Sequence, residues 1–308
     1  MPVPVIDADA LARLLPMESA IDALHAAFAA DELPVAPLRS NLETASGTLL
    51  LMPSHGAQGV GVKLVTLTGS NPARGLPFIH AAYVLFDAET QAPAALLDGA
   101  ALTALRTAAV SGLATRFLAR DDARRLVLFG AGVQARSHLA AMRAVRPVEE
   151  VVVVSRGRER AQGLVDEASA LGLAASVGDP GAESEADLVC TCTTSETPVL
   201  AGSVLADGVH VNAVGAYTTT MRELDAEAVR RARVVVETRE AAAAEAGDLA
   251  LAIADGAIGP DHVVADLREV VRGARVRTSD RDVTLFESVG VAFEDLIVAR
   301  AAVDRLGA

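Results

Sequence analysis

The chain has 308 residues, of which 51% are apolar, and its formal net charge at pH 7 is −13. This length exceeds what one hydrophobic core usually supports, so we expect two domains. The acidic balance without a Lys/Arg-rich run argues against a nucleic-acid partner, and no apolar stretch reaches the roughly 20 residues that cross a membrane. Because the N-terminus has no basic-then-apolar signal pattern, we expect a cytoplasmic protein.

The first region of the chain mixes helices and strands. Apolar spacing predicts helices over residues 11–30, with a break near Pro16, and a long Ala-rich helix over residues 98–116. Between these helices the sequence predicts strands at 48–52, 60–68 and 81–86, the last two joined by a loop at 71–77.

One residue count singles out a position in the second of these strands. Of the 27 Lys and Arg residues, Lys63 is the only lysine. A chain that uses Arg wherever a cation suffices, and keeps Lys at one place, indicates chemistry there that Arg cannot perform, because a buried ammonium can release a proton and a guanidinium cannot. The alternative is a surface lysine retained by chance. The apolar run at 59–67 argues against it, because an unpartnered ammonium there is costly.

The second region opens with an apolar strand at 126–129, the turn Gly130-Ala-Gly132 and a helix over 133–146. Gly130 permits a sharp turn, and Gly132 leaves no side chain in the way of a pyrophosphate. The open helix N-terminus, with Val133 and Gln134 in its first turn, offers N–H groups and a partial positive charge to an anion. The pattern predicts a dinucleotide site, with a plain tight turn as the alternative.

Strands and helices alternate along the rest of this region. Further strands are expected at 150–154, near 175, and at 187–192, 210–214 and 233–237; helices are expected at 158–171, 241–246 and 263–272, with a final amphipathic helix ending near 306. The βαβ order predicts an α/β fold, a Rossmann-type doubly wound parallel sheet beside a smaller α+β domain. Cys190 and Cys192 are expected to be small buried residues, and no metal site is expected.

The end of the second strand of this region bears on the choice of dinucleotide. An Asp or Glu there binds both ribose hydroxyls of NAD, but this chain has Ser155 and Arg156. These residues favour binding of the 2′-phosphate of NADP, and NAD is the alternative cofactor. If the arginine has no role in binding, it is a solvated side chain at the start of a helix. Thr193 and Thr194 follow a later strand at the same edge of the sheet and are expected to contact the dinucleotide.

A set of short motifs identifies a family. They are Met52-Pro53, Gly61-Val-Lys63, Asn71 with Gly75-Leu-Pro77, Leu102-Thr-Ala-Leu-Arg106, Phe129-Gly-Ala-Gly-Val-Gln134, Asn212-Ala-Val-Gly215, Arg222-Glu-Leu-Asp225, Glu245-Ala-Gly-Asp248 and Phe286-Glu-Ser-Val-Gly290. With these motifs, in this order and spacing, the chain resembles the ornithine cyclodeaminase/mu-crystallin family over nearly its full length.

The resemblance implies a homodimer of two-domain subunits. Residues 1–118 together with 291–308 would form the substrate-binding and dimerisation domain. Residues 119–290 would form the NAD(P)-binding Rossmann domain.

The resemblance also implies site residues. Arg39, Lys63 and Arg106 match the basic residues of the family's substrate pocket, where Arg106 would clamp a carboxylate and Lys63 would assist protonation. Cofactor contacts are implied for Val214, Gly215, Val289 and Gly290. The alternative for Arg106 is a helix cation paired with an acid such as Asp98.

One departure from the family pattern bears on the reaction. Cyclodeaminases and alanine dehydrogenases of the family carry an Asp where this chain has Tyr217. The resemblance is therefore to members that reduce ketimines, and we expect NAD(P)H-dependent reduction of a small cyclic or linear ketimine carboxylate such as Δ1-pyrroline-2-carboxylate. Lys63 and Arg106 would be catalytic, Tyr217 would contact the substrate, and His80 or Tyr217 are further proton-donor candidates.

Two other functions remain open at this point. One is a lyase that converts ornithine to proline and ammonia with a recycled NAD. The other is a non-catalytic, NADPH-dependent binder of a small ligand, of the crystallin type.

Overall fold

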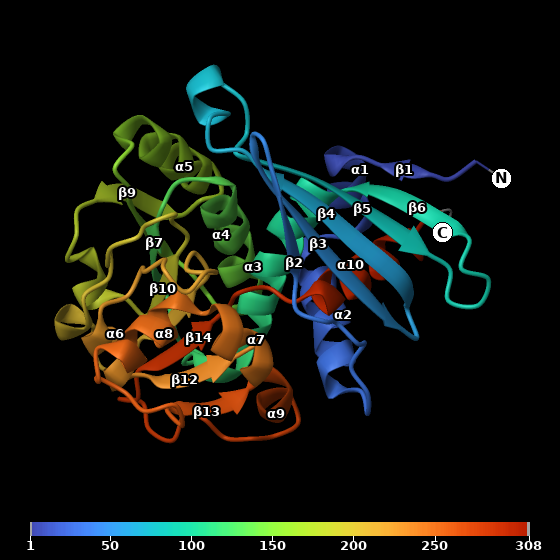
Figure 1. Cartoon of the computed structure of the whole chain (residues 1–308). Helices are drawn as coiled ribbons and strands as arrows, with labels where there is room; N and C mark the ends of the chain where they lie inside the picture. The colour runs from blue at the N-terminus through green and yellow to red at the C-terminus, as the bar shows by residue number, and fades with distance from the viewer. Residues whose placement is uncertain (1, 307–308) are drawn as a thin grey trace. The chain divides into compact units, whose positions relative to one another are not determined.

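The computed structural model describes residues 2–306, and the chain divides into two compact units (Figure 1). The first unit comprises the chain up to Arg106 and from Val291 onward, and the second comprises Thr107–Gly290. The boundary at Arg106 falls inside helix α3 (Gly99–Leu118).

The first unit is built on a six-stranded sheet in the order β1-β6-β5-β4-β3-β2. β1 pairs with β6 in parallel, and the other neighbours are antiparallel. The strands are β1 (Val5–Ile6), β2 (Ser40–Thr44), β3 (Gly47–Gly56), β4 (Gly59–Leu67), β5 (Ile79–Phe86) and β6 (Pro93–Asp98). The single-turn 3₁₀ helix η1 (Pro72–Arg74) lies in the loop between β4 and β5.

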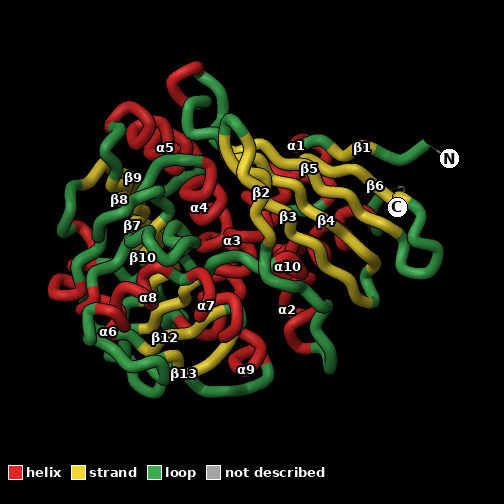
Figure 2. The backbone as a smooth tube through the Cα atoms, in the orientation of Figure 1, coloured by secondary structure: helices red, strands yellow, loops and turns green. Residues whose placement is uncertain are grey.

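Among the described residues, three helices lie wholly within the first unit, which also contains the start of α3. They are α1 (Ala8–Leu14), α2 (Met17–Ala29) and α10 (Ala292–Val303). α10 packs against β3, β4 and β5, and α2 packs against α10 (Figure 2). A Phe28–Phe293 edge-to-face contact, with ring centroids 5.5 Å apart, joins the two helices.

The second unit contains an eight-stranded parallel sheet in the order β13-β12-β14-β11-β10-β7-β8-β9. The strands are β7 (Arg125–Phe129), β8 (Glu150–Val154), β9 (Ala174–Gly178), β10 (Leu188–Thr191), β11 (His210–Ala213), β12 (Arg233–Val236), β13 (Val263–Asp266) and β14 (Thr284–Glu287). The central strands are buried along almost their whole length because helices and loops cover both faces, which explains their Val- and Leu-rich sequences. The expected α/β fold with a Rossmann-type parallel sheet is confirmed.

The helices of the second unit connect these strands. They are α4 (Val133–Val145), α5 (Arg158–Ala170), α6 (Ala226–Arg231), α7 (Arg239–Glu245), α8 (Gly247–Ala254) and α9 (Leu267–Val271), with 3₁₀ turns η2 (Ala182–Glu185) and η3 (Gly202–Val204). The order of strands reverses between β7 and β10, so the carboxyl ends of these two strands form the crevice where open parallel sheets bind ligands.

Two sequence-based element assignments are wrong. The helix expected over residues 263–272 is a strand over Val263–Asp266 followed by the short α9, because Asp266 caps the helix through the backbone N–H of Glu269 and ends the β-branched run before it. The last helix is not amphipathic: α10 is buried from Ala292 to Ala299, including two acidic residues.

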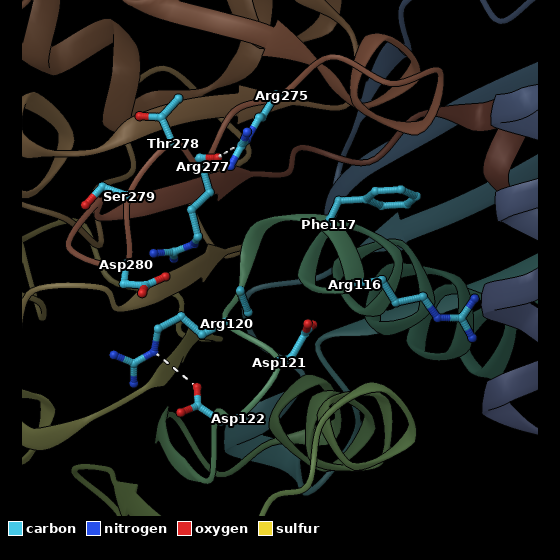
Figure 3. Close-up of a pocket in the computed structure, with 11 residues that line it drawn as sticks. Arg116, Phe117, Arg120, Asp121, Asp122, Arg275, Arg277, Thr278, Ser279 and Asp280 are labelled. Atoms are coloured by element: carbon cyan, nitrogen blue, oxygen red, sulfur yellow. Dashed lines mark hydrogen bonds and ion pairs between the residues drawn. The ribbon is translucent and has the colours of Figure 1, made fainter.

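A cavity of about 630 Å³ lies in the second unit, at the amino ends of the strands (Figure 3). Its lining comes from the segment before β7, including Arg120 and Asp122, and from the segment before β14, including Arg277 and Asp280. Arg277 donates to the carbonyls of Leu118, Gly208 and Asp282, and Arg120 pairs with Asp122 and Asp187. These arginines connect loops at the amino ends of the strands, the edge of the sheet opposite to the predicted dinucleotide site.

Candidate active site residues in the two units

Lys63 lies in the middle of β4, on the face of the sheet that α10 covers. Its side chain is 1% exposed, and burial alternates along the strand, so Gly59, Gly61 and Val65 share its face. Tyr83 is its register partner on β5. A Cβ at Gly61 would overlap the Tyr83 hydroxyl, so glycine at that position leaves the room that Tyr83 occupies beside Lys63.

Two buried carboxylates of α10 hold the basic side chains. The Lys63 Nζ lies 2.9 Å from Oδ1 and 2.8 Å from Oδ2 of Asp295. Arg106, on α3, donates from Nη1 to Glu294 Oε2 at 3.0 Å, and its Nε lies 3.4 Å from Asp295 Oδ1. Both carboxylate side chains are 0% exposed. The structure therefore brings Lys63 and Arg106 into one buried cluster of opposite charges.

The environment of Lys63 makes its proton easier to release. Burial and the charges of Arg106 and Arg39 together lower its pKa to about 8, although the charge and hydrogen bond of Asp295 oppose them. Burial and the Asp295 charge raise the pKa of the Tyr83 hydroxyl above its usual range, so Tyr83 stays protonated. Lys63 is thus a cation near neutral pH that can act as an acid.

The other predicted residues of the first unit have different settings. Arg39 is half-buried before β2 and is close enough to lower the Lys63 pKa. His80 is exposed and three residues from Tyr83 along β5, so its side chain points to the opposite face of the sheet. Asp98, considered as a partner of Arg106, instead accepts the N–H groups of Ala100 and Ala101 at the start of α3.

In the second unit the turn after β7 is shaped for a phosphate. Gly130 has φ +106°, its N–H donates to Val154 O at 2.9 Å, and an added Cβ would lie 2.6 Å from Cys192 O. Gly132 is the N-cap of α4, and a Cβ there would meet no atom within 4 Å. The space beside the N-terminus of α4 at Gly132 is therefore open, which fits a pyrophosphate.

The first turn of α4 adds two further features. Val133 is 66% exposed although it is apolar. The Oε1 of Gln134 is buried and, among the described residues, has no hydrogen-bond partner. The exposure of Val133 fits a residue that a bound dinucleotide would cover.

The end of β8 carries positive charge. Ser155 is half-buried and Arg156 exposed, and the exposed Arg158 pairs with Asp179 at 3.0 Å. Arg160, which the sequence reasoning did not single out, lies over Gly157, with its Nε 3.1 Å from where a Cβ would stand. The loop thus presents a hydroxyl and guanidinium groups at the position where NAD-specific sheets carry an acid.

A buried glutamate that the sequence reasoning missed braces two of the expected cofactor loops. Glu223 accepts the N–H of Thr193 at 2.6 Å, the N–H of Gly215 at 2.7 Å and the hydroxyl of Thr191 at 2.8 Å. It joins the loop after β10, which continues to Thr194, to the loop after β11, which contains Val214. The signal in the sequence was its place in the motif Arg222-Glu-Leu-Asp225.

A second buried glutamate, Glu237, accepts hydrogen bonds from the loop that follows β14. Glu237 accepts the hydroxyl of Ser288 at 2.7 Å and the N–H of Val289 at 2.9 Å, and it accepts the N–H of Gly290 with both oxygens. The carboxyl ends of β10, β11, β12 and β14 are thereby fixed by side-chain carboxylates rather than by backbone pairing alone.

Two more acids lie in the same buried cluster. Asp248 accepts the N–H groups of Glu223 and Leu224, both at 2.8 Å, and its burial raises its pKa to about 7. Burial and the charges of Asp248, Glu223 and Glu237 raise the pKa of Glu287 well above its usual range. Asp248 is therefore partly protonated near neutral pH, and Glu287 holds a proton more readily than an exposed glutamate does.

Tyr217 is half-buried in the loop after β11, in the second unit. Cys190 is buried and Cys192 half-buried, both free, and burial raises the pKa of Cys190 to about 12. Within residues 2–306, no group of three or more His, Cys, Asp or Glu residues is placed to hold a metal ion. In the same part of the chain, no helix has the length and apolar character of a membrane span.

Residues 5–308 match the model of the ornithine cyclodeaminase/mu-crystallin family. The chain belongs to this family. In an alignment of 314 positions it is 38% identical to a Δ1-pyrroline-2-carboxylate reductase of Bacillus cereus, and the alignment covers 98% of this chain and 96% of that protein.

Two solved structures of the family have the same fold. A Thermococcus litoralis Δ1-pyrroline-2-carboxylate reductase, in complex with NADH and L-proline, is 35% identical, with a TM-score of 0.94, covering 98% of this chain and 97% of that one. An archaeal alanine dehydrogenase dimer with bound NAD is 32% identical, with a TM-score of 0.93, covering 99% and 96%. The family predicted from the sequence motifs is confirmed.

Proposed function

We propose that this member of the ornithine cyclodeaminase/mu-crystallin family catalyses the NAD(P)H-dependent reduction of a small ketimine carboxylate, with Δ1-pyrroline-2-carboxylate as the leading substrate. The observation that carries the proposal is the buried cluster of Lys63 and Arg106, in a chain that is 38% identical to a reductase of that imine. The L-proline bound in the Thermococcus litoralis enzyme agrees with a cyclic amino-acid product.

The basic side chains of the cluster suit a substrate with a carboxylate. Lys63 and Arg106 lie in one buried cluster, and the charge of Arg39 acts on Lys63. These cations attract an anionic substrate. Arg106, with Arg39, binds the carboxylate, because a guanidinium presents donors in a fork that matches the two oxygens.

Lys63 holds and delivers the proton. Its pKa of about 8 keeps most of it protonated at neutral pH and makes it a stronger acid than an ordinary lysine. The ammonium donates a hydrogen bond to the substrate nitrogen and transfers a proton there as the C=N bond is reduced. When bound, the reduced nicotinamide supplies the hydride.

Residues of the second unit hold the dinucleotide. Gly130, Gly132, Val133 and Gln134 bind the pyrophosphate region at the start of α4. The loops containing Thr193 and Thr194, Val214 and Gly215, and Val289 and Gly290 border the nicotinamide. Glu223 and Glu237 support this assignment, because they accept hydrogen bonds from backbone N–H groups of the same loops.

We propose NADP as the preferred form of the cofactor. Relatives of known structure contain NADH or NAD, so the preference rests on Ser155 and Arg156 in place of an acid after β8. Changing Ser155→Asp together with Arg156→Ala should shift the ratio of kcat/KM for NADPH and NADH toward NADH by at least ~10-fold, since a charge-assisted contact to the 2′-phosphate is lost and an acceptor for the ribose hydroxyls is gained. An unchanged ratio would refute the preference.

The chain is also proposed to form a homodimer through a substrate and dimer domain of residues 1–118 and 291–308, which adds the rest of α3 to the first unit. The archaeal alanine dehydrogenase is a dimer. Light scattering on the purified chain tests this assembly: a single species of twice the 31.7 kDa chain mass supports it, and a monomer contradicts it.

The reaction itself is tested by following NADPH oxidation with Δ1-pyrroline-2-carboxylate while ammonia is measured in parallel. The proposal expects NADPH consumption matched by proline formation, without ammonia. Ornithine-dependent ammonia release without net cofactor change would identify a lyase, and binding without turnover would identify a crystallin-type binder; either outcome refutes the reductase. Tyr217, in place of the Asp found in cyclodeaminases, supports the reductase.

Lys63→Arg isolates the role of the lysine. It keeps the positive charge but removes a group that can give up a proton, so kcat should fall by ~100-fold or more, the usual contribution of general acid catalysis. Arg74→Lys, in the exposed loop before β5, is a matched control and should leave kcat unchanged. Full activity in Lys63→Arg would show that the assigned role is wrong.

A further inference from the structure

Helix α10 buries two consecutive acidic residues, Glu294 and Asp295, in a segment that is otherwise apolar. The residues around them, Ala292, Phe293, Leu296 and Ile297, are all buried. Removing a carboxylate from water costs several kcal/mol unless it is paired and hydrogen-bonded. An apolar pair would pack in this helix without that cost, so the two carboxylates need a reason beyond stability.

Each carboxylate makes its shorter ion pair with a different cation. Asp295 places both oxygens within 2.9 Å of the Lys63 Nζ, and Glu294 accepts from Arg106 at 3.0 Å. The second Arg106 contact, to Asp295, is longer at 3.4 Å. Because Glu294 holds Arg106, Asp295 remains available to Lys63.

The contact also fixes the direction of the ammonium. Lysine has four rotatable bonds in its side chain and no preferred direction for its three N–H donors. On β4, with Tyr83 beside it, the Lys63 side chain ends against α10, where both oxygens of Asp295 lie on one side of the nitrogen. The donors turned away from Asp295 are then presented in one direction.

We propose that Asp295 is a positioning residue for the reduction: it holds the Lys63 ammonium charged and oriented in the substrate half of the site, while Glu294 holds Arg106. This inference rests on the proposed function and adds to it a residue that neither binds substrate nor reacts. Without Asp295, Lys63 loses the carboxylate that contacts its nitrogen, so the ammonium loses its orientation and gives up its proton at a lower pH.

The single lysine of the chain makes the inference directly measurable. Protein grown with ¹³Cε,¹⁵Nζ-lysine has one labelled side chain, Lys63, and its Cε signal reports protonation during a pH titration. In the wild type we expect a midpoint near 8. In Asp295→Asn the midpoint should fall by about one unit or more, because the stabilising negative charge is removed. In the matched variant Glu294→Gln it should move by less than half as much.

Kinetics supply the readout that a purely structural role would not move. In Asp295→Asn, the alkaline limb of the pH profile of kcat should shift to lower pH by the same amount as the Lys63 titration midpoint, and KM should change little. In Glu294→Gln, KM for the imine should rise ~10-fold, because the carboxylate-binding Arg106 is released, with the pH profile kept. Asp295→Glu, which retains the charge, should restore a midpoint close to the wild-type value.

The outcomes separate this inference from the proposed function. An equal titration midpoint in Asp295→Asn and the wild type overturns the role of Asp295 and leaves the reductase standing. A wild type that does not oxidise NADPH with the imine overturns the reductase whatever the titration gives. If Asp295→Asn does not fold, the wild-type protein still tests the proposal. An ammonium held by Asp295 should give a resolved ¹⁵Nζ signal that is protected from solvent exchange at pH 6–7. A signal averaged by exchange with solvent refutes the positioning role.

Discussion

Asp248→Asn tests the buried carboxylate cluster at the carboxyl edge of the second sheet. Asp248 is fully buried, and its Oδ1 accepts two backbone N–H groups, which an asparagine oxygen can also accept. Its Oδ2 is buried and, among the described residues, has no hydrogen-bond partner. The substitution therefore removes a titrating charge and little else.

The sign of the effect follows from linkage. The Asp248 pKa is raised from 3.8 to about 7 in the folded chain, so the folded state keeps a proton that the unfolded state has already lost. Stability from this group is therefore complete below pH 3.8 and is lost as the pH rises through 7. About three pKa units correspond to about 4 kcal/mol, of which about 2 kcal/mol is lost between pH 5.5 and 8.5.

Urea unfolding followed by circular dichroism, at pH 5.5 and 8.5 and a fixed protein concentration, measures this loss. The wild type should lose about 2 kcal/mol more than Asp248→Asn over that interval, and the variant should be the more stable protein at pH 8.5. Asp166→Asn, which changes an exposed carboxylate on α5, should follow the wild type. Equal pH dependence in the wild type and Asp248→Asn would refute the assignment of a buried proton to this cluster.

Three further tests, two of them with a second variant for comparison, address single contacts. Gly61→Ala places a methyl group on the Tyr83 hydroxyl and should lower the free energy of unfolding by about 1–3 kcal/mol, and Tyr83→Phe in the same chain should recover part of that loss in urea unfolding. Gly130→Ala, at φ +106°, should weaken NADPH binding at least ~10-fold in a titration of the dinucleotide's own fluorescence; unchanged affinity would exclude this turn as the pyrophosphate site. Glu223→Gln replaces one of the two oxygens that accept the Thr193 and Gly215 N–H groups with an NH₂ donor and should raise the NADPH Kd ~10-fold, whereas the exposed Glu227→Gln should not; equal Kd values would show that these hydrogen bonds do not affect cofactor binding.

The elements that sequence reasoning predicted are those with strong local patterns. The strand at 150–154 and the turn at Gly130 combine β-branched runs, glycines and a following helix, and the structure has both. The family and the reductase function were predicted from short motifs and agree with the relatives. The domain boundaries and the residues assigned to the site remain predictions.

The missed elements lacked such patterns. β2 (Ser40–Thr44) is exposed along its whole length, so it has no apolar alternation to read. β6 begins with a proline, which lowers strand propensity although the first position of a strand tolerates it. The strand part of residues 263–272 was hidden because four residues are too few to distinguish a buried strand from the first turn of a helix.

The carboxylates of the site could not be found from sequence for a different reason. Asp295 lies 232 positions from Lys63, and Glu294 lies 188 positions from Arg106. In sequence both are acidic residues near the start of a helix, a common and favourable placement on an exposed face. Only the return of the last helix across β3, β4 and β5 makes them partners of the cations, and that return is a property of the fold rather than of the local sequence.

The geometry of this cluster also explains why one lysine persists in a chain otherwise restricted to arginine. At Arg106 a fixed positive charge and a planar fork suffice, because the expected task is to bind a carboxylate. At position 63 the nitrogen meets both oxygens of one carboxylate in a space bounded by Tyr83 and α10, where a guanidinium would need additional acceptors for its five donors. Burial there lowers the pKa of an ammonium to about 8 and would leave a guanidinium charged. The size of the side chain and its ability to release a proton thus both favour lysine at position 63. The Lys63→Arg variant distinguishes these two reasons. If it folds and binds L-proline but does not reduce the imine, the lysine is required for proton transfer.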